Sequence, residues 1–410
     1  MVRVTAAALA LLAAAPGAPP SAAAAGRAAD EPLAAVQEVL DARVDAVRRH
    51  DAAAFLATVD PSAPPAFRAA QARQFEGLRS LPLASFTLRA TTEDTGDLGT
   101  GLSVRYGGAP VFLPETLQAY RLEGYDDRAA VDHLWLTFVR RDGRWFVAGD
   151  TDLEALGLET DRQLWDFGPV RLTRTEHVLV LSHPSQAGRA EALAAVTEEA
   201  VAEFSRRWDR PWPGRVPVVL PRSVDQLGRM LETGLDLDKF LAFASYGVER
   251  AGGGWEPTAP RVLVNDTRLG DTTRAAQVET LVHELVHVAT APVSGPFVPV
   301  WVHEGLADWV ATGRRPGERR PAGGDARLPR DHELSSGSST AIVRAYRESR
   351  AAVSLLAARR GDGVPPAFFE RLGAVRVAPG SVDHQVDATL RAVAGLTLGE
   401  LEAAWAARRP

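Results

Sequence analysis

The sequence contains no cysteine among its 410 residues. The chain therefore forms no disulfide, offers no thiolate to a metal, and has no cysteine for lipid attachment. If it binds a metal ion, the ligands must be His, Asp or Glu side chains.

Strong net charge and long apolar runs are also missing. The formal net charge of -6 is modest for this length, which gives no reason to expect nucleic acid or an anionic membrane as a partner. No apolar run is long enough to cross a bilayer. The content of 46% hydrophobic and 24% charged residues is typical of a globular protein. The chain is longer than a single hydrophobic core usually supports, which predicts two domains after the N-terminal segment.

The N-terminus has the pattern of a secretion signal. Arg3 precedes an apolar run from Val4 to Ala15, and small residues at 23–25 precede Gly26. This order predicts a signal peptide over residues 1–25 and a secreted or extracytoplasmic protein, with no stable membrane span after cleavage. The alternative for the same segment is a disordered tail rich in Ala and Pro.

Residues 32–160 read as helices followed by strands. Helical spacing is found over 33–47, after Asp51, and over 66–78, whereas period-two alternation is found over 85–90, 101–106 and 120–124. Two strands around the turn Asp142-Gly143 predict a hairpin. The order favours a small α+β domain. It resembles the cone-shaped domains typified by nuclear transport factor 2, and this resemblance implies an accessory domain.

Residues 172–410 form a second predicted α+β domain with a helical C-terminal part. Strands are expected at 176–183, 216–220 and 261–265, with helices at 187–208 and after Ser223. The segment 314–339 is rich in Gly, Arg and Pro and predicts a mobile loop. From 341 to 409 the pattern is helical, with breaks near Gly361, Pro379 and Gly395.

The central motif of this second domain is His283-Glu284-Leu285-Val286-His287. Positions i and i+4 share one face of a helix, so both imidazoles can reach one ion, while Glu284 lies close enough to hold a water molecule. We expect this helix to begin at Asp271 or Thr272 and to be apolar almost all round. The alternative is a helix with two surface histidines and a glutamate in a salt bridge.

A second motif, Trp301-Val302-His303-Glu304-Gly305-Leu306-Ala307-Asp308-Trp309, begins a helix near Pro299. Catalytic zinc usually takes three protein ligands and keeps a fourth position for water. Glu304 is the predicted third ligand. Asp308, four residues later on the same face, can accept a hydrogen bond from the far nitrogen of a ligand histidine. The alternative is an exposed acidic face.

Together these two motifs resemble the gluzincin metallopeptidases. The resemblance implies Zn²⁺ bound by His283, His287 and Glu304, with Glu284 as the catalytic acid and base and Asp308 supporting His283. Three departures are present: His303 stands where the large subfamilies usually have Asn, no Gly-x-Met-Glu-Asn-like stretch lies upstream, and the interval to Glu304 is slightly shorter than theirs. The second departure weighs against a familiar aminopeptidase.

The function predicted from these features is an exported zinc metallopeptidase acting on peptides or proteins. Members of this clan usually add a Tyr or His that stabilises the oxyanion, and Tyr346 and His303 are the candidates; for Tyr346 the alternative is core packing. Strand 262–265 is the expected edge strand for an extended peptide. Two other functions stay open: a noncatalytic binding or structural protein, and a zinc hydrolase of a non-peptide amide or ester.

Overall fold

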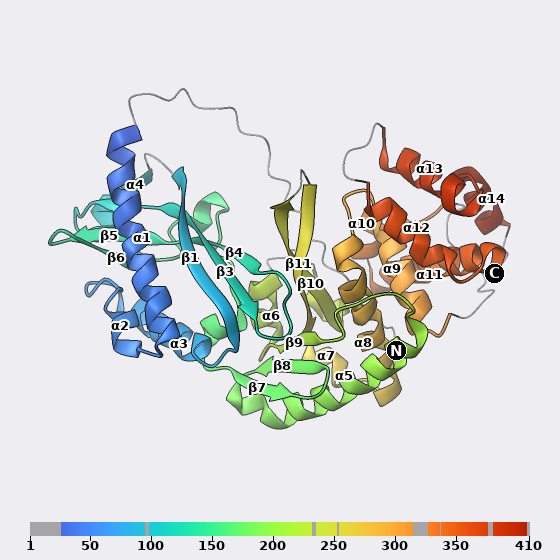
Figure 1. The fold of residues 1–410 in the computed structure, drawn as a ribbon, viewed down its shortest axis with the longest axis horizontal. Helices are drawn as coiled ribbons and strands as arrows, with labels where there is room; N and C mark the ends of the chain where they lie inside the picture. Colours follow the sequence, from blue (N-terminus) through green and yellow to red (C-terminus); the bar gives the residue numbers. More distant parts are fainter. Residues whose placement is uncertain are drawn as a thin grey trace. The chain divides into compact units, whose positions relative to one another are not determined.

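The computed structural model describes residues 26–94, 98–231, 235–251, 254–314, 327–336, 338–375 and 380–407. The predicted signal peptide lies outside these ranges. The fold is mixed α+β, as predicted, with three small sheets and a helical C-terminal region (Figure 1). The chain divides into two compact units. The N-terminal unit runs to Leu172 and includes Ser182–Ser185, and the C-terminal unit comprises Thr173–Leu181 and Gln186–Pro410.

The N-terminal unit packs helices against two three-stranded sheets, in the orders β1-β3-β4 and β2-β5-β6. Helix α1 contacts β1 and β6, and η3 packs on α3. Trp165 of η3 packs edge-to-face on Tyr120 with ring centroids 4.9 Å apart. The elements are α1 (Gly26–Arg48), α2 (Ala52–Leu56), α3 (Pro65–Leu78), β1 (Leu83–Asp94), α4 (Leu98–Ser103), η1 (Val104–Tyr106), β2 (Val111–Phe112), β3 (Pro114–Leu122), β4 (Ala130–Trp135), β5 (Thr137–Arg141), β6 (Arg144–Gly149), η2 (Glu154–Leu156) and η3 (Leu164–Phe167).

The predicted hairpin is confirmed between β5 and β6. Asp142 and Gly143 both have positive φ, 48° and 82°, which is the backbone that a tight two-residue turn needs to match the strand twist. The strand before the turn is shorter than predicted. It breaks at Leu136 into β4 and β5, which belong to different sheets.

The prediction of a strand over 101–106 was wrong. This segment contains the end of α4 and the short helix η1. Val104 is 82% exposed, so the alternating apolar residues do not form one buried face. Alternation indicates a strand only where a partner strand and a core meet it.

The C-terminal unit is built on a five-stranded sheet in the order β10-β11-β9-β8-β7. β10 pairs antiparallel with β11, and β11 pairs parallel with β9. The strands are β7 (Arg171–Arg174), β8 (Val178–Ser182), β9 (Val216–Leu220), β10 (Ala242–Ala251) and β11 (Gly254–Val264).

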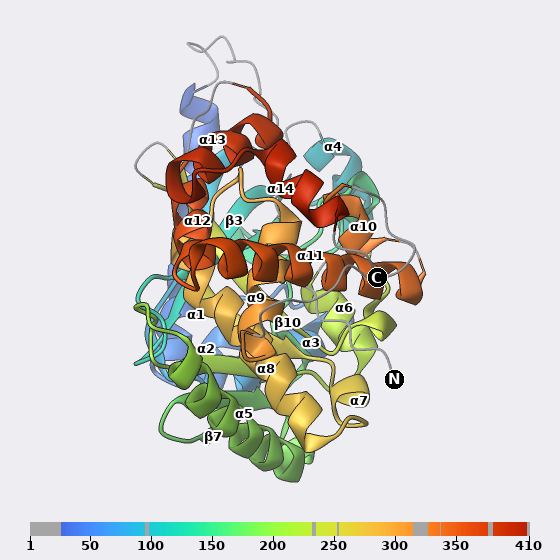
Figure 2. The ribbon, with the colours of Figure 1, turned by 90° about the vertical axis from the view of Figure 1, so that its right-hand side faces the viewer.

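Helices cover this sheet and extend the unit towards its C-terminus. Helix α8 contacts β10 and β11 and also packs against α5 and α9, while α9 packs against α11 (Figure 2). The helices are η4 (Pro184–Gln186), α5 (Ala187–Arg207), α6 (Val224–Leu231), η5 (Leu237–Lys239), α7 (Asp266–Leu269), α8 (Arg274–Thr290), η6 (Ala291–Val293), α9 (Val300–Ala311), α10 (Asp331–Ser335), α11 (Ser339–Arg360), α12 (Val364–Gly373), α13 (Val382–Ala394) and α14 (Leu398–Ala406).

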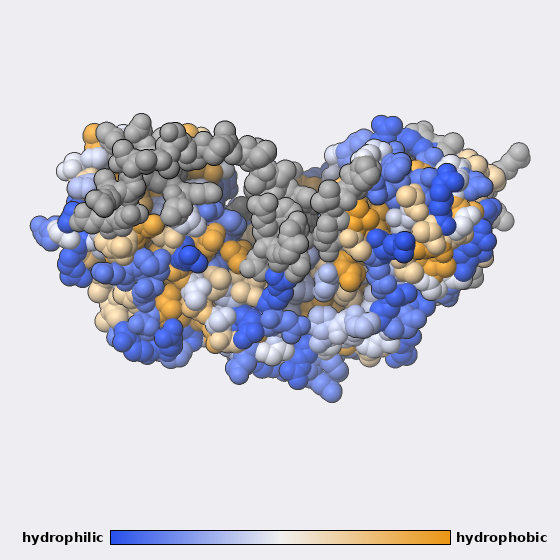
Figure 3. Space-filling model, turned by 45° about the horizontal axis from the view of Figure 1, so that its top comes forward, coloured by the Kyte–Doolittle hydropathy of each residue, from blue (hydrophilic) through white to orange (hydrophobic). Residues whose placement is uncertain are grey.

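The predicted loop over 314–339 needs correction in its described part, because α10 forms there and Leu328 and Leu334 are buried. Among the described residues, no helix combines the length and the apolar content that crossing a bilayer requires. On the face drawn in Figure 3, hydrophilic and hydrophobic residues are interspersed. Leu56, Val104 and Leu156, three of the exposed large apolar residues, come from separate segments.

We predict that Gly77→Ala destabilises the N-terminal unit by about 1–3 kcal/mol through overpacking. A Cβ atom at Gly77 would lie 2.5 Å from the Cβ of Trp165 and 2.7 Å from the carbonyl oxygen of Gly168. The matched control is Gly101→Ala in α4 of the same unit, where no atom lies within 4 Å of the added Cβ. Chemical unfolding followed by tryptophan fluorescence compares the two, and equal stability of both variants would contradict the proposed packing.

Candidate metal centre

The central motif lies in the most deeply buried part of helix α8. The helix begins at Arg274, two or three residues later than predicted, and it is capped by Thr273, whose hydroxyl accepts from the Ala276 N–H. Every residue from Thr280 to Thr290 is buried. His283, Glu284 and His287 are at most 3% exposed. The apolar surface predicted for this helix is therefore enclosed, and these three polar side chains face protein on all sides.

Helix α9 supplies the third candidate ligand. It begins after Pro299, as predicted, and its first N–H, on Val300, donates to Asp331 of α10. Gly305 lets α9 lie against α11, because a Cβ there would come within 2.5 Å of the Ser349 carbonyl oxygen. This close approach fixes the helix that carries Glu304, which is fully buried.

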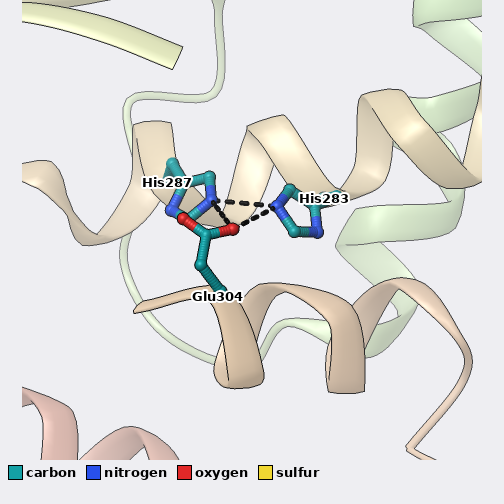
Figure 4. Close-up of side chains that lie close together, drawn as sticks. All are labelled: His283, His287 and Glu304. Atoms are coloured by element: carbon teal, nitrogen blue, oxygen red, sulfur yellow. Dashed lines mark hydrogen bonds and ion pairs between the residues drawn. The ribbon is translucent and has the colours of Figure 1, made fainter. Parts of the chain in front are cut away.

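His283, His287 and Glu304 point towards one another (Figure 4). His283 Nε2 lies 3.0 Å from His287 Nε2 and 3.2 Å from Glu304 Oε2, and His287 Nε2 lies 3.7 Å from the same oxygen. Bonds of about 2.0–2.2 Å in tetrahedral geometry place zinc ligand atoms roughly 3.3–3.6 Å apart. The side chains are thus spaced as ligands of one small ion, and they form the three-ligand group found in the described part of the chain.

Asp308 lies behind His283. Its Oδ1 is 2.8 Å from His283 Nδ1, so Nδ1–H can donate to the carboxylate and leave the Nε2 lone pair directed at the cluster. Burial lowers the pKa of His283, but the hydrogen bonds with Asp308 and Glu304 outweigh it and hold this pKa well above its usual range. Although burial opposes it, the charge of His287 keeps the pKa of Glu304 well below its usual range. The negative charges of Asp308 and Glu304 thus complement a positive charge at this site, whether it comes from protonated imidazoles or from a bound cation.

Glu284 is fully buried. Neither of its carboxylate oxygens meets a hydrogen-bond partner of good geometry among the described residues. The backbone of Ala244 on β10 is nevertheless near enough to lower its pKa, while burial dominates and raises that pKa to about 8. A buried carboxylate without a partner is costly. Its place one residue after His283 fits a group that works on a water molecule beside a cation.

The two candidates for oxyanion stabilisation have different surroundings. Tyr346 on α11 is buried, with its ring centroid 6.4 Å from that of His283. Burial, the charge of Glu304 and a hydrogen bond with Glu304 raise the pKa of Tyr346 well above its usual range. His303 Nε2 lies 3.4 Å from the Ser294 hydroxyl, and its ring packs edge-to-face on Phe369. Burial lowers the pKa of His303 to about 3, so its imidazole is neutral.

The prediction that strand 262–265 forms the sheet edge was wrong. Those residues belong largely to β11, which lies between β10 and β9, and the edge next to α8 is β10. Sequence reasoning missed β10. The strand reads Ala242-Phe243-Ala244-Ser245-Tyr246-Gly247, and Ala and Gly are depleted in strands. Phe243 and Tyr246, two aromatic residues of high strand propensity, were the available signal.

Comparison with models of known protein families finds no match, and comparison with curated proteins finds none either.

We predict that Gly305→Ala both destabilises the C-terminal unit, by about 1–3 kcal/mol, and weakens metal binding. The added methyl group would push α9 away from Ser349 and move Glu304 with it. Gly188→Ala on α5 is the matched control, because no atom lies within 4 Å of its added Cβ. Thermal unfolding and metal titration test both effects. Wild-type metal affinity in Gly305→Ala would contradict the role of this contact.

Proposed function

We propose that this protein is a zinc-dependent hydrolase that cleaves peptide bonds. The observation that carries the proposal is the buried cluster of His283, His287 and Glu304, whose ligand atoms lie 3.0–3.7 Å apart. Two further features support it: Asp308 behind His283, and the unpartnered carboxylate of Glu284. Nitrogen and oxygen donors in a set of three are typical of catalytic zinc.

When bound, zinc would lower the pKa of a water molecule and polarise the scissile carbonyl group. The chain's own residues supply the other functions. His283, His287 and Glu304 hold the ion, and Asp308 fixes the orientation of His283. Glu284 accepts a proton from the attacking water and later delivers it to the nitrogen of the leaving amine. A site with a purely structural role has no need of such a base.

The edge strand β10 indicates which class of substrate the site binds. Among the strands that the structure describes, β10 pairs only with β11, and it contacts α8, the helix of His283 and His287. An extended peptide can bind such an edge through main-chain hydrogen bonds. The Ala244 backbone, which lies near Glu284, brings this edge to the proposed base. A peptide is therefore a better match to the site than a small ester.

The resemblance to the gluzincins leads to the same proposal. His283-Glu284-x-x-His287 with Glu304-Gly305-x-Ala307-Asp308 agrees with the clan's ligand, base and supporting positions. We retain export as part of the proposal, based on the N-terminal sequence pattern. The main alternative is a protein that binds zinc without catalysis.

The first test compares zinc content and peptide cleavage in wild type and in Glu284→Gln. We expect both to bind one zinc ion, whereas Glu284→Gln loses about 10²–10⁴-fold in cleavage rate, because the base is absent. Glu279→Gln, on the same helix and half-buried, is the matched control. Zinc content by elemental analysis and cleavage of a diverse peptide mixture by mass spectrometry are the measurements. Equal turnover by wild type and Glu284→Gln would contradict the role of Glu284 as the general base. Zinc binding without any cleavage would favour the noncatalytic alternative.

The second test addresses Asp308. We expect Asp308→Ala to weaken zinc affinity about 10–100-fold, because His283 loses the group that orients its ring. Competition against a chromophoric chelator measures the affinity. Asp383→Ala, an exposed residue on α13, controls for loss of one negative charge. An unchanged affinity in Asp308→Ala would show that the 2.8 Å contact does not support the ligand.

A further inference from the structure

A buried arginine without a carboxylate partner lies inside the N-terminal unit. Arg43 of α1 is 3% exposed. Its Nη1 donates to Thr58 Oγ1 at 2.9 Å, and its Nη2 donates to the side-chain oxygens of Gln71 and Gln74 at 2.5 and 3.2 Å. The guanidinium also lies over the ring of Phe55, whereas its Nε meets no hydrogen-bond partner among the described residues. Burial lowers the pKa of Arg43 to about 9, so the group is still charged at neutral pH, and a buried charge without an opposite charge beside it is costly.

The contacts of Arg43 fix which way the neighbouring amide groups point. A guanidinium carries only donors, so Gln71 must present its oxygen to Arg43 and keep its NH₂ group as a donor. In the part of the chain that the structure describes, no group accepts from this NH₂ group. Gln74 differs, because its NH₂ group donates to Asp166 Oδ1 at 2.7 Å. The unmatched groups are therefore the Nε–H of Arg43 and the NH₂ of Gln71, and both are donors.

The residues that carry these donors line a cavity of about 20 Å³ inside the N-terminal unit. A cavity needs roughly 10–15 Å³ to hold one water molecule, so this one has room for a single guest of similar size. A monatomic anion fits this space, and a polyatomic organic anion does not. The apolar part of the lining comprises Phe55, Leu78, Phe86, Leu88, Leu134 and Leu136.

Three acidic residues also line the cavity, and each is engaged by another group. Asp150 forms an ion pair with Arg162 at 2.6 Å and acts on Arg43 only from a greater distance. Asp161 accepts a backbone N–H bond from β4. Asp166 accepts two hydrogen bonds, one on each carboxylate oxygen. Arg43 is thus the charged group of this lining that has no opposite charge in contact with it.

We propose that this cavity binds one chloride ion, held by the Nε–H group of Arg43 and the NH₂ group of Gln71. Chloride matches the site in charge and size, and it accepts hydrogen bonds without donating any. A water molecule would match the donors but would bring no negative charge to Arg43. The bound ion would connect α1, which carries Arg43, to α3, which carries Gln71, so the stability of the N-terminal unit would depend on chloride. This site is separate from the metal centre and does not rest on the proposed hydrolysis.

Gln71→Glu is the variant that tests the site. A carboxylate at this position would accept from Arg43 as the amide oxygen does, while it adds the missing negative charge and removes the NH₂ donor. Chloride should then no longer bind. Arg73→Gln is the matched control, because it makes the same change in net charge at an exposed position of the same helix. Replacing Arg43 itself is less informative, since Thr58, Gln71 and Gln74 would lose their shared donor.

The first measurement is thermal unfolding of the full chain by calorimetry, in sodium chloride and in sodium gluconate at equal ionic strength. Gluconate carries the same charge as chloride and is too large for the cavity. At a chloride concentration of roughly ten times Kd, we expect the N-terminal unit of wild type and of Arg73→Gln to unfold about 3–5 °C higher than in gluconate. Gln71→Glu should unfold at the same temperature in both salts. A general salt effect, or chloride bound at a metal ion, would act on all three proteins equally.

The second measurement locates the ion. Crystals grown in sodium bromide should show anomalous scattering beside Arg43 in wild type and none there in Gln71→Glu. Equal unfolding temperatures of wild type in chloride and gluconate would overturn the inference. An undiminished chloride effect in Gln71→Glu would also do so, since the ion would then bind elsewhere. So would a cavity that holds water without bromide.

Discussion

The main constraint on the C-terminal unit is the free-energy cost of burying polar side chains. Four side chains that prefer water, His283, Glu284, His287 and Glu304, lie inside a helical layer with at most 3% exposure. Each buried polar group without a partner costs free energy, and each buried charge costs more. The two histidines and Glu304 meet this cost partly by contact with one another. A cation between them would offset it more completely, since all three would direct lone pairs at one positive charge.

Contacts outside this cluster hold its side chains in place. Asp308 fixes His283 from behind, and Gly305 lets α9 approach the backbone of α11 at Ser349. Asp331 caps the start of α9. A side chain at position 305 or a lost cap would shift the helix that carries Glu304. The ligand geometry is therefore set by contacts outside the cluster, as is general for metal sites in proteins.

The sequence revealed the local parts of this arrangement and missed the non-local ones. The spacing of His283 and His287 is a property of one helix, and Asp308 lies one turn after Glu304, so both relations could be read directly. The α+β class followed from the order of periodic segments. Strand order did not, because the parallel pairing of β11 with β9 joins residues far apart in the chain, Val262 with Val218. β10 pairs with the next strand, β11, and it was missed because its small residues are depleted in strands. The false strand at 101–106 has the same origin, since alternation without a partner strand carries little information.

In the proposed hydrolase, the edge strand β10 would connect Glu284 to the substrate. β10 packs against helix α8, which carries Glu284, and the backbone of Ala244 lies near that carboxyl group. A peptide that pairs with this strand would have its register set by the backbone that lies near Glu284. Its scissile carbonyl would then be fixed relative to Glu284. Positioning of this kind can supply a large share of a rate enhancement.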